Sequence, residues 1–141
     1  MILYLDTSAL VKLYVEETGT TEVAVWVEQA SIVATARIAY AEARAAFARH
    51  RREGGLTAAL LRRVVAHLDA DWGRYAVVEI SDALVRNAGR LAERHGLRGF
   101  DAIHLAAATD LRDPDDGLAF GCFDGELNRA ARRERLTALV R

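Results

Sequence analysis

The chain has 141 residues, of which 52% are hydrophobic and 28% charged, and its formal net charge of −1 gives no bulk positive charge of the kind that marks many nucleic-acid-binding proteins. These values fit a single globular domain, 1–141, that is large enough to bury a hydrophobic core. One cysteine excludes a disulfide framework and a cysteine zinc site, and there is neither an apolar run of membrane-spanning length nor a signal peptide, so we expect a protein of the reducing cytoplasm without membrane contact.

The first ten residues join a short apolar run to an acid and a helix start. Met1 to Leu5 is continuously apolar, which is typical of a strand buried on both faces in a parallel sheet. Asp6 follows at the carboxyl end of that strand, and Thr7 or Ser8 is expected to cap a helix that begins at Ala9. Ligands of open α/β sheets bind at this edge. Asp6 is therefore either a turn residue satisfied by backbone N–H groups or a metal ligand.

Helical and strand-like segments alternate along the rest of the chain. Hydrophobic spacing and turn signals predict strands over 31–35, 76–80, 118–122 and 136–140. They predict helices over 9–17, 22–30, 36–52, 57–75, 82–95 and 127–135, and one more that starts near Gly99. This alternation predicts an α/β fold, with a central parallel β-sheet flanked by helices on both faces.

Glu42 is the unusual residue of the long third helix. Its neighbours three and four positions away are Ile38, Ala39, Ala45 and Ala46, and none of them is polar. A carboxylate on such a face is unfavourable unless another group pairs with it. Glu42 is either a surface residue paired with a nearby arginine or a functional carboxylate, and the sequence favours neither.

Two further acids have defined positions. Asp101 lies in the first turn of the helix near Gly99, where a negative charge interacts well with the helix dipole. His104 follows on the same face, at a spacing that could hold a metal, but we expect a core histidine. Asp124 repeats the placement of Asp6, after a strand and before a helix, and is either an N-cap or a ligand.

These acids can converge. In a parallel α/β sandwich, Asp6, Glu42, Asp101 and Asp124 can meet at one carboxyl edge of the sheet. Converged carboxylates repel one another unless they are protonated or neutralised by cations. Oxygen ligands without a cysteine cluster suit Mg²⁺ or Mn²⁺, and such ions serve phosphoryl chemistry.

Four segments, taken together and in this order, resemble the PIN domain and, more narrowly, the VapC-type toxins of type II toxin–antitoxin systems. They are Tyr4-Leu5-Asp6-Thr7-Ser8-Ala9-Leu10, Tyr40-Ala41-Glu42, Phe100-Asp101-Ala102-Ile103-His104-Leu105-Ala106 and Phe123-Asp124. The resemblance covers nearly the whole chain. One departure concerns Cys122, since many relatives carry Thr or Ser two residues before the fourth acid, and it bears on how Asp124 is positioned.

The resemblance implies a Mg²⁺- or Mn²⁺-dependent endoribonuclease that hydrolyses RNA phosphodiester bonds. It also implies inhibition by a cognate VapB-type antitoxin, and usually a homodimer. The catalytic set that it assigns is Asp6, Glu42, Asp101 and Asp124. Asp6 and Asp101 would hold the metal most directly, Asp124 would add a direct or water-mediated contact, and Glu42 would orient or deprotonate the attacking water.

The sequence also suggests residues for phosphate contact and for a partner surface. Phosphate contacts are expected from Thr7 or Ser8, and from arginines that could equally be solvated helix faces: Arg49, Arg51, Arg52, Arg129, Arg132 and Arg133. Some apolar side chains of the first two helices are expected to stay exposed for an antitoxin, namely among Val11, Val15 and Trp26. His67 and His95 are expected to be solvated.

Two alternatives compete with the nuclease. A haloacid-dehalogenase-like phosphatase also begins with a strand that ends in Asp, but that family normally has a second Asp two residues later, where this chain has Ser8. A non-catalytic RNA- or protein-binding module on the same fold is the other alternative, because a fold does not guarantee activity.

Overall fold

The computed structural model describes residues 1–141 and contains one parallel five-stranded sheet. Its strands are β1 (Ile2–Leu5), β2 (Ile32–Ala36), β3 (Ala76–Val78), β4 (Ala119–Gly121) and β5 (Thr137–Ala138). They are arranged in the order β3-β2-β1-β4-β5, and all neighbours run parallel. The predicted α/β fold with a central parallel sheet is therefore confirmed.

The strand order reverses at β1. The chain passes from β1 to β2 and β3 on one side, and returns to β4 and β5 on the other. Tyr4 pairs with Ala34 of β2 and with Phe120 of β4, and the backbone N–H of Asp6 donates to Gly121 O at 3.2 Å. The segments after β1 and β4 thus leave the sheet side by side, at the switch point where open α/β sheets bind ligands.

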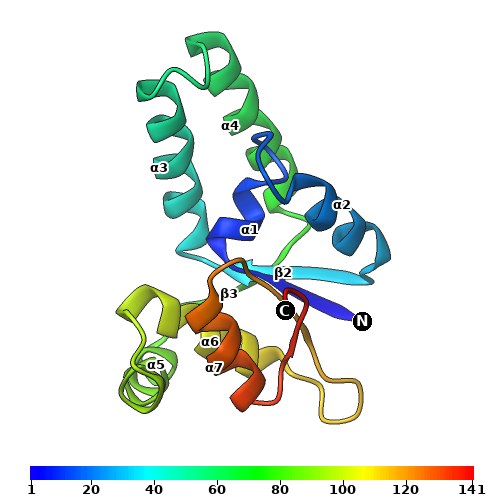
Figure 1. Ribbon diagram of the computed structural model, residues 1–141, viewed down its shortest axis with the longest axis vertical. Helices are drawn as coiled ribbons and strands as arrows, with labels where there is room; N and C mark the ends of the chain where they lie inside the picture. The colour runs from blue at the N-terminus through cyan, green and yellow to red at the C-terminus, as the bar shows by residue number, and fades with distance from the viewer.

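Seven helices cover the two faces of the sheet (Figure 1). On one side lie α1 (Thr7–Val11), α2 (Thr20–Gln29), α3 (Ala39–Arg52) and α4 (Ala58–Trp72). On the other side lie α5 (Asp82–His95), α6 (Gly99–Leu111) and α7 (Gly125–Arg133). None of these helices combines the length and the apolar character that crossing a membrane requires.

Two hydrophobic cores hold these layers together. Leu3 and Leu5 of β1 point into the core beneath α1 to α4, whereas Tyr4 points into the core beneath α5 to α7. All three side chains are fully buried. The apolar run at the start of the chain is therefore buried on both faces, as predicted, because helices cover both faces of the sheet.

The structure corrects the predicted start of the first helix. The cap is Asp6, not Thr7 or Ser8, and α1 ends at Val11 instead of continuing to Glu17. The carboxylate of Asp6 accepts the backbone N–H of Ala9, because Asp6 has the extended backbone of an N-cap. Asp6 thus begins the helix as well as ending the strand.

Candidate active site

A cleft of about 580 Å³ opens at the carboxyl edge of the sheet, beside the switch point. The structure brings all four predicted acids into it. The residues that line the cleft are Asp6, Thr7, Ser8, Glu42, Arg49, Arg98, Asp101, His104, Phe123 and Asp124. These side chains come from the segments after β1 and β4, from the first turns of α1 and α3, and from the N-terminal half of α6 with its N-cap, with Arg49 near the far end of α3. The catalytic roles of the acids stay predictions.

Asp6 is held rigidly at the end of β1. It is only 5% exposed, and its Oδ1 accepts hydrogen bonds from Ala9 N at 3.0 Å and from Ser8 Oγ at 2.7 Å. Ser8 is thus a partner of the acid. Burial, and after it the charge of Asp6, raise the pKa of the Cys122 thiol well above its ordinary value. The thiol therefore stays protonated beside the carboxylate.

Asp124 is oriented by the helix that it caps. Its Oδ1 accepts the backbone N–H groups of Glu126 at 2.8 Å and Leu127 at 3.1 Å, as the N-cap of α7. Its own backbone N–H donates to Cys122 Sγ at 3.2 Å. Cys122 is compatible with this arrangement, because the cap fixes the carboxylate and the sulfur accepts only a backbone hydrogen bond. Oδ2 of Asp124 makes no hydrogen bond within the chain.

The pKa of Asp101 shows that the carboxylates of the cleft influence one another. Burial raises its pKa, the charges of Asp124 and Asp6 raise it further, and His104 and Arg98 oppose them only in part. The carboxylates of β1, β4 and α6 are therefore close enough to repel one another. A proton or a bound cation at this point would relieve the repulsion.

Glu42 is the centre of a hydrogen-bonded network that reaches into the core. Its Oε1 accepts a hydrogen bond from Thr7 Oγ1 at 2.6 Å and lies 2.9 Å from His104 Nε2. Nδ1 of His104 lies 2.7 Å from the hydroxyl of Tyr4. Burial raises the pKa of Glu42, but the hydrogen bonds from His104 and Thr7 outweigh burial and hold it below its ordinary value. Glu42 is thus an ionised carboxylate paired with His104, not with an arginine.

His104 is both a core residue and a site residue. It is 2% exposed, as a core histidine should be. Because an ionised carboxylate only accepts hydrogen bonds, Nε2 carries the hydrogen toward Glu42, and Nδ1 is hydrogen-bonded to the Tyr4 hydroxyl. The pairing of His104 with Glu42 was not predicted. The spacing of His104 from Asp101 places both on one helix face, but it does not identify Glu42 as the partner.

Two arginines line the cleft, and only one of them was predicted. Arg49 of α3 is the member of the predicted clusters that lines the cleft. Arg98, just before α6, is the other and was not singled out. Arg51 and Arg52 are exposed beyond the cleft at the end of α3.

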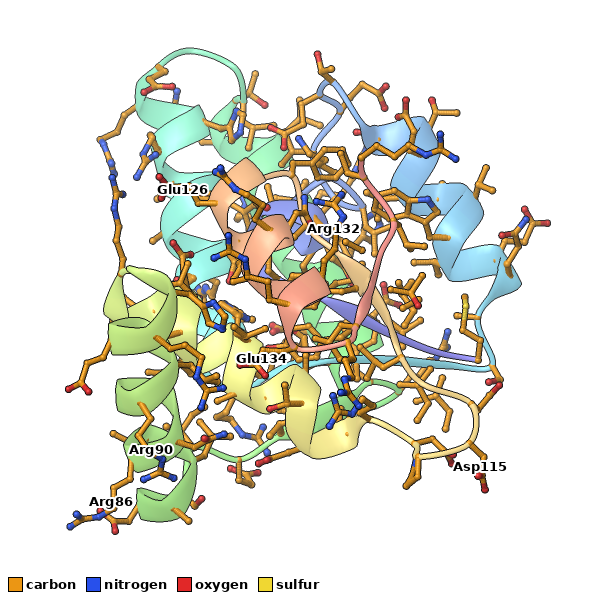
Figure 2. All side chains as sticks on the ribbon, turned by 60° about the horizontal axis from the view of Figure 1, so that its bottom comes forward. Arg86, Arg90, Asp115, Glu126, Arg132 and Glu134 are labelled. Atoms are coloured by element: carbon orange, nitrogen blue, oxygen red, sulfur yellow. The ribbon has the colours of Figure 1, made fainter.

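The arginines of α7 lie elsewhere. Arg132 donates a hydrogen bond to the carbonyl oxygen of Val140, and Figure 2 marks Arg132 and Glu126 on this helix. Arg129 and Arg133 line a separate cavity of about 210 Å³ together with Glu126 and His95. His95 is not solvated as expected, since its side chain is 4% exposed and its Nε2 lies 2.9 Å from Glu134 Oε1.

The residues of the cleft fit a hard divalent cation in their chemistry. No group of three or more His, Cys, Asp or Glu side chains is arranged closely enough to hold a metal ion as it stands. All the acids nevertheless offer oxygen donors, and the carboxylate of Asp101 has no hydrogen-bond partner although its neighbours raise its pKa. Mg²⁺ in proteins is commonly held by one or two carboxylates and several waters, which a loose cleft accommodates.

The predicted partner surface needs correction. Val11 at the end of α1 and Val15 after it are buried in the core, and α1 packs against α3. Trp26 is partly buried and stacks on Phe123, with their ring centroids 5.5 Å apart. On α2 the exposed large apolar residue is Val25.

The chain is similar to known proteins in sequence and in fold. Residues 3–133 match the family model of the PIN domain. The chain is 35% identical to "Ribonuclease VapC45" of Mycobacterium tuberculosis (strain CDC 1551 / Oshkosh) over 130 residues, which covers 92% of this chain and 89% of the relative.

Solved structures share the fold at low identity. The crystal structure of PAE2754 from Pyrobaculum aerophilum superposes with a TM-score of 0.68 at 21% identity, over 94% of this chain and 81% of that chain. The crystal structure of VapBC2 from Rickettsia felis bound to a DNA fragment from their promoter gives 0.62 at 15% identity, over 92% of each chain. At these identities the structural likeness concerns the fold alone.

Proposed function

Because the chain belongs to the PIN domain family, we propose that it is a Mg²⁺- or Mn²⁺-dependent endoribonuclease of the VapC type, the toxin of a toxin–antitoxin pair. The observation that carries the proposal is the common cleft of Asp6, Glu42, Asp101 and Asp124 at the switch point of the sheet. The relative named as a ribonuclease matches this chain over nearly its full length, which supports RNA as the substrate.

Asp6, Asp101 and Asp124 are the residues that would hold the cation. A divalent cation bound there supplies a Lewis acid that neutralises charge on the attacked phosphate. Asp6 and Asp124 each use Oδ1 to cap a helix, which fixes the direction of the carboxylate before any ligand binds. Asp101 adds a carboxylate with no competing hydrogen bond.

We propose that Glu42 orients or deprotonates the attacking water. Thr7 and His104 occupy Oε1, which leaves Oε2 to accept a proton from a water molecule in the cleft. The lowered pKa keeps the carboxylate ionised and ready to accept. Arg49 and Arg98 line the same cleft and can bind the phosphates on either side of the cleaved bond.

A cognate VapB-type antitoxin is proposed as the neutralising partner, and a homodimer as the assembly. The fold likeness to VapBC2 from Rickettsia felis supports the first of these. An antitoxin arginine that reaches the carboxylates of the cleft would compete with the metal. Co-purification with the product of the neighbouring gene, followed by a nuclease assay of the complex, tests the partner. A complex as active as the free chain would contradict inhibition.

The activity is tested with purified, antitoxin-free protein on a panel of structured and linear RNAs. Cleavage should be abolished by EDTA and restored by Mg²⁺ or Mn²⁺. Asp6→Asn and Asp101→Asn should each lose most activity, because each removes a charged ligand. Protein that binds Mn²⁺ but leaves the whole panel uncut would favour the binding module. The match to the PIN family speaks against the phosphatase.

A further inference from the structure

Phe100 is an exposed aromatic side chain immediately beside the acidic cleft. It is 62% exposed, whereas the other exposed large apolar residues lie between 40% and 46%. It stands in the first turn of α6, directly before Asp101. Its ring stacks on no other aromatic ring in the chain, in contrast to Trp26 and Phe123. The most exposed large apolar surface of the protein is therefore next to the acid whose pKa its neighbours raise.

A second cavity, of about 510 Å³, places this ring against the cleft. It is lined by Glu42, Arg98, Gly99, Phe100, Asp101 and Ile103. Glu42, Arg98 and Asp101 line the acidic cleft as well, so the two cavities share a wall. Phe100 and Ile103 make one side of the second cavity apolar, and Arg98 adds a cation at the shared wall. A ligand can thus extend from the carboxylates to the phenyl ring without leaving the surface.

This combination matches the chemistry of one nucleotide. Because the cleft and the second cavity share Glu42, Arg98 and Asp101 as lining residues, an RNA chain with a phosphodiester in the cleft can place a neighbouring base in the second cavity. Unpaired RNA bases stack on aromatic side chains, and arginine pairs with the phosphate backbone. Resting on the proposed function, we propose that Phe100 is a positioning residue, on which a base next to the cleaved bond stacks.

Cleavage kinetics test the stacking through matched variants. Phe100→Ala and Phe100→Leu should lower kcat/KM about tenfold, mainly by raising KM, because a lost base–aromatic stack weakens RNA binding. Phe100→Trp should retain wild-type kcat/KM. Leu60→Ala on α4 removes an exposed apolar side chain that lines neither the cleft nor the second cavity, and should leave the kinetics unchanged. All variants should keep the wild-type Tm, since the ring is not packed in the core.

A binding measurement does not depend on cleavage. Single-stranded RNA oligonucleotides that carry one 2-aminopurine at successive positions are titrated with protein in EDTA. The 2-aminopurine fluorescence should change on binding to wild type and to Phe100→Trp, and this change should be lost with Phe100→Leu. An inactive wild type that still gives this pattern would refute the nuclease but not the stacking.

Two results would contradict the proposed stacking of a base on Phe100. Equal RNA affinity and fluorescence for Phe100→Leu and wild type would overturn the stacking, even where the wild type cleaves RNA. Sedimentation equilibrium tests whether a second copy of the chain, and not an RNA base, occupies the second cavity. If Phe100→Ala dissociates an oligomer and leaves RNA affinity unchanged, Phe100 is a contact between copies of the chain and the proposal is wrong.

Discussion

Nε2 of His104 lies 2.9 Å from Oε1 of Glu42, so a histidine buried on α6 orients a carboxylate of α3. The other ring nitrogen is anchored by the hydroxyl of Tyr4, which is itself fully buried. The network thus links the core of the sheet to the edge of the cleft. Because each of its members has a partner, the orientation of Glu42 is set by packing as well as by hydrogen bonds.

Removal of His104 should therefore affect both stability and chemistry. His104→Ala is expected to lower the free energy of unfolding by about 2–4 kcal/mol, since it leaves a cavity and the buried Tyr4 hydroxyl without its partner. It should also lower kcat more than it raises KM, because Glu42 loses its orientation. Tyr4→Phe is the milder control, since it leaves the His104–Glu42 pair in place. Urea unfolding and steady-state cleavage measure the two effects, and a wild-type kcat in His104→Ala would contradict a positioning role.

Glu42 should leave a signature in the pH dependence of stability. Its folded pKa is lowered, so its ionised form is favoured by folding. The resulting stability is fully present above the unfolded Glu pKa of about 4.3, and it is lost as the pH falls through the lower folded pKa. Glu42→Gln should lack this contribution, and should reduce turnover more than Mn²⁺ affinity. Unfolding of both proteins across the acid range measures the difference, and parallel profiles would contradict the assignment.

Metal binding should stabilise the fold through Asp101. Binding to the folded state alone contributes roughly 2.7 kcal/mol at a hundredfold excess of ligand over Kd, so Mn²⁺ or Mg²⁺ should raise Tm. Asp101→Asn should reduce this rise. Because the folded pKa of Asp101 is raised, ionised Asp101 destabilises the metal-free fold at pH values above that pKa. This loss of stability is relieved as the pH falls through the folded pKa and Asp101 is protonated. Asp101→Asn should thus stabilise the metal-free protein at neutral pH. An equal rise in Tm on metal addition for wild type and Asp101→Asn would contradict a metal site that includes Asp101.

The sequence predicted the fold well, because its signals are local. The apolar run of β1 and the alternation of strands and helices determine a parallel sheet with two covered faces. Asp6 and Asp124 could be located because an acid after a buried strand lies at the ligand-binding edge by topology alone. Asp101 could be located by its place at a helix start.

The parts that the sequence did not predict depend on tertiary contacts. The partner of Glu42 is 62 residues away in the chain, and no periodicity indicates which helix faces α3 across the cleft. His95 was expected on the solvent face of its helix. Its ring is instead buried and lies against Glu134, which follows α7. Val11 and Val15 look like a partner surface in isolation, yet both belong to the buried core beneath α1 to α4.

Asp124 allows the cap and the charge to be separated. Asp124→Asn keeps an oxygen that can accept the N–H groups of Glu126 and Leu127, and it removes only the charge. Asp124→Ala removes both, and should lower the free energy of unfolding by about 1 kcal/mol more than Asp124→Asn. Because Asp124 is expected to add only a direct or water-mediated contact, Asp124→Asn should reduce cleavage less than Asp6→Asn or Asp101→Asn. Thermal melts and cleavage rates of these variants provide the comparison, and full inactivation by Asp124→Asn would make Asp124 an essential ligand.

The arginines provide the last prediction, through the salt dependence of RNA binding. Arg49 lines the cleft, whereas Arg132 is engaged with the carbonyl oxygen of Val140. If Arg49 neutralises one phosphate, Arg49→Ala should reduce the slope of log K against log [salt] by about 0.7, the value for one contact on a single strand. Arg132→Ala should leave the slope unchanged, although it loses a similar positive charge from the protein. Fluorescence anisotropy of a labelled RNA at several salt concentrations measures both slopes. Equal slopes for the two variants would show that net charge, and not the position of Arg49 in the cleft, governs the contact with RNA.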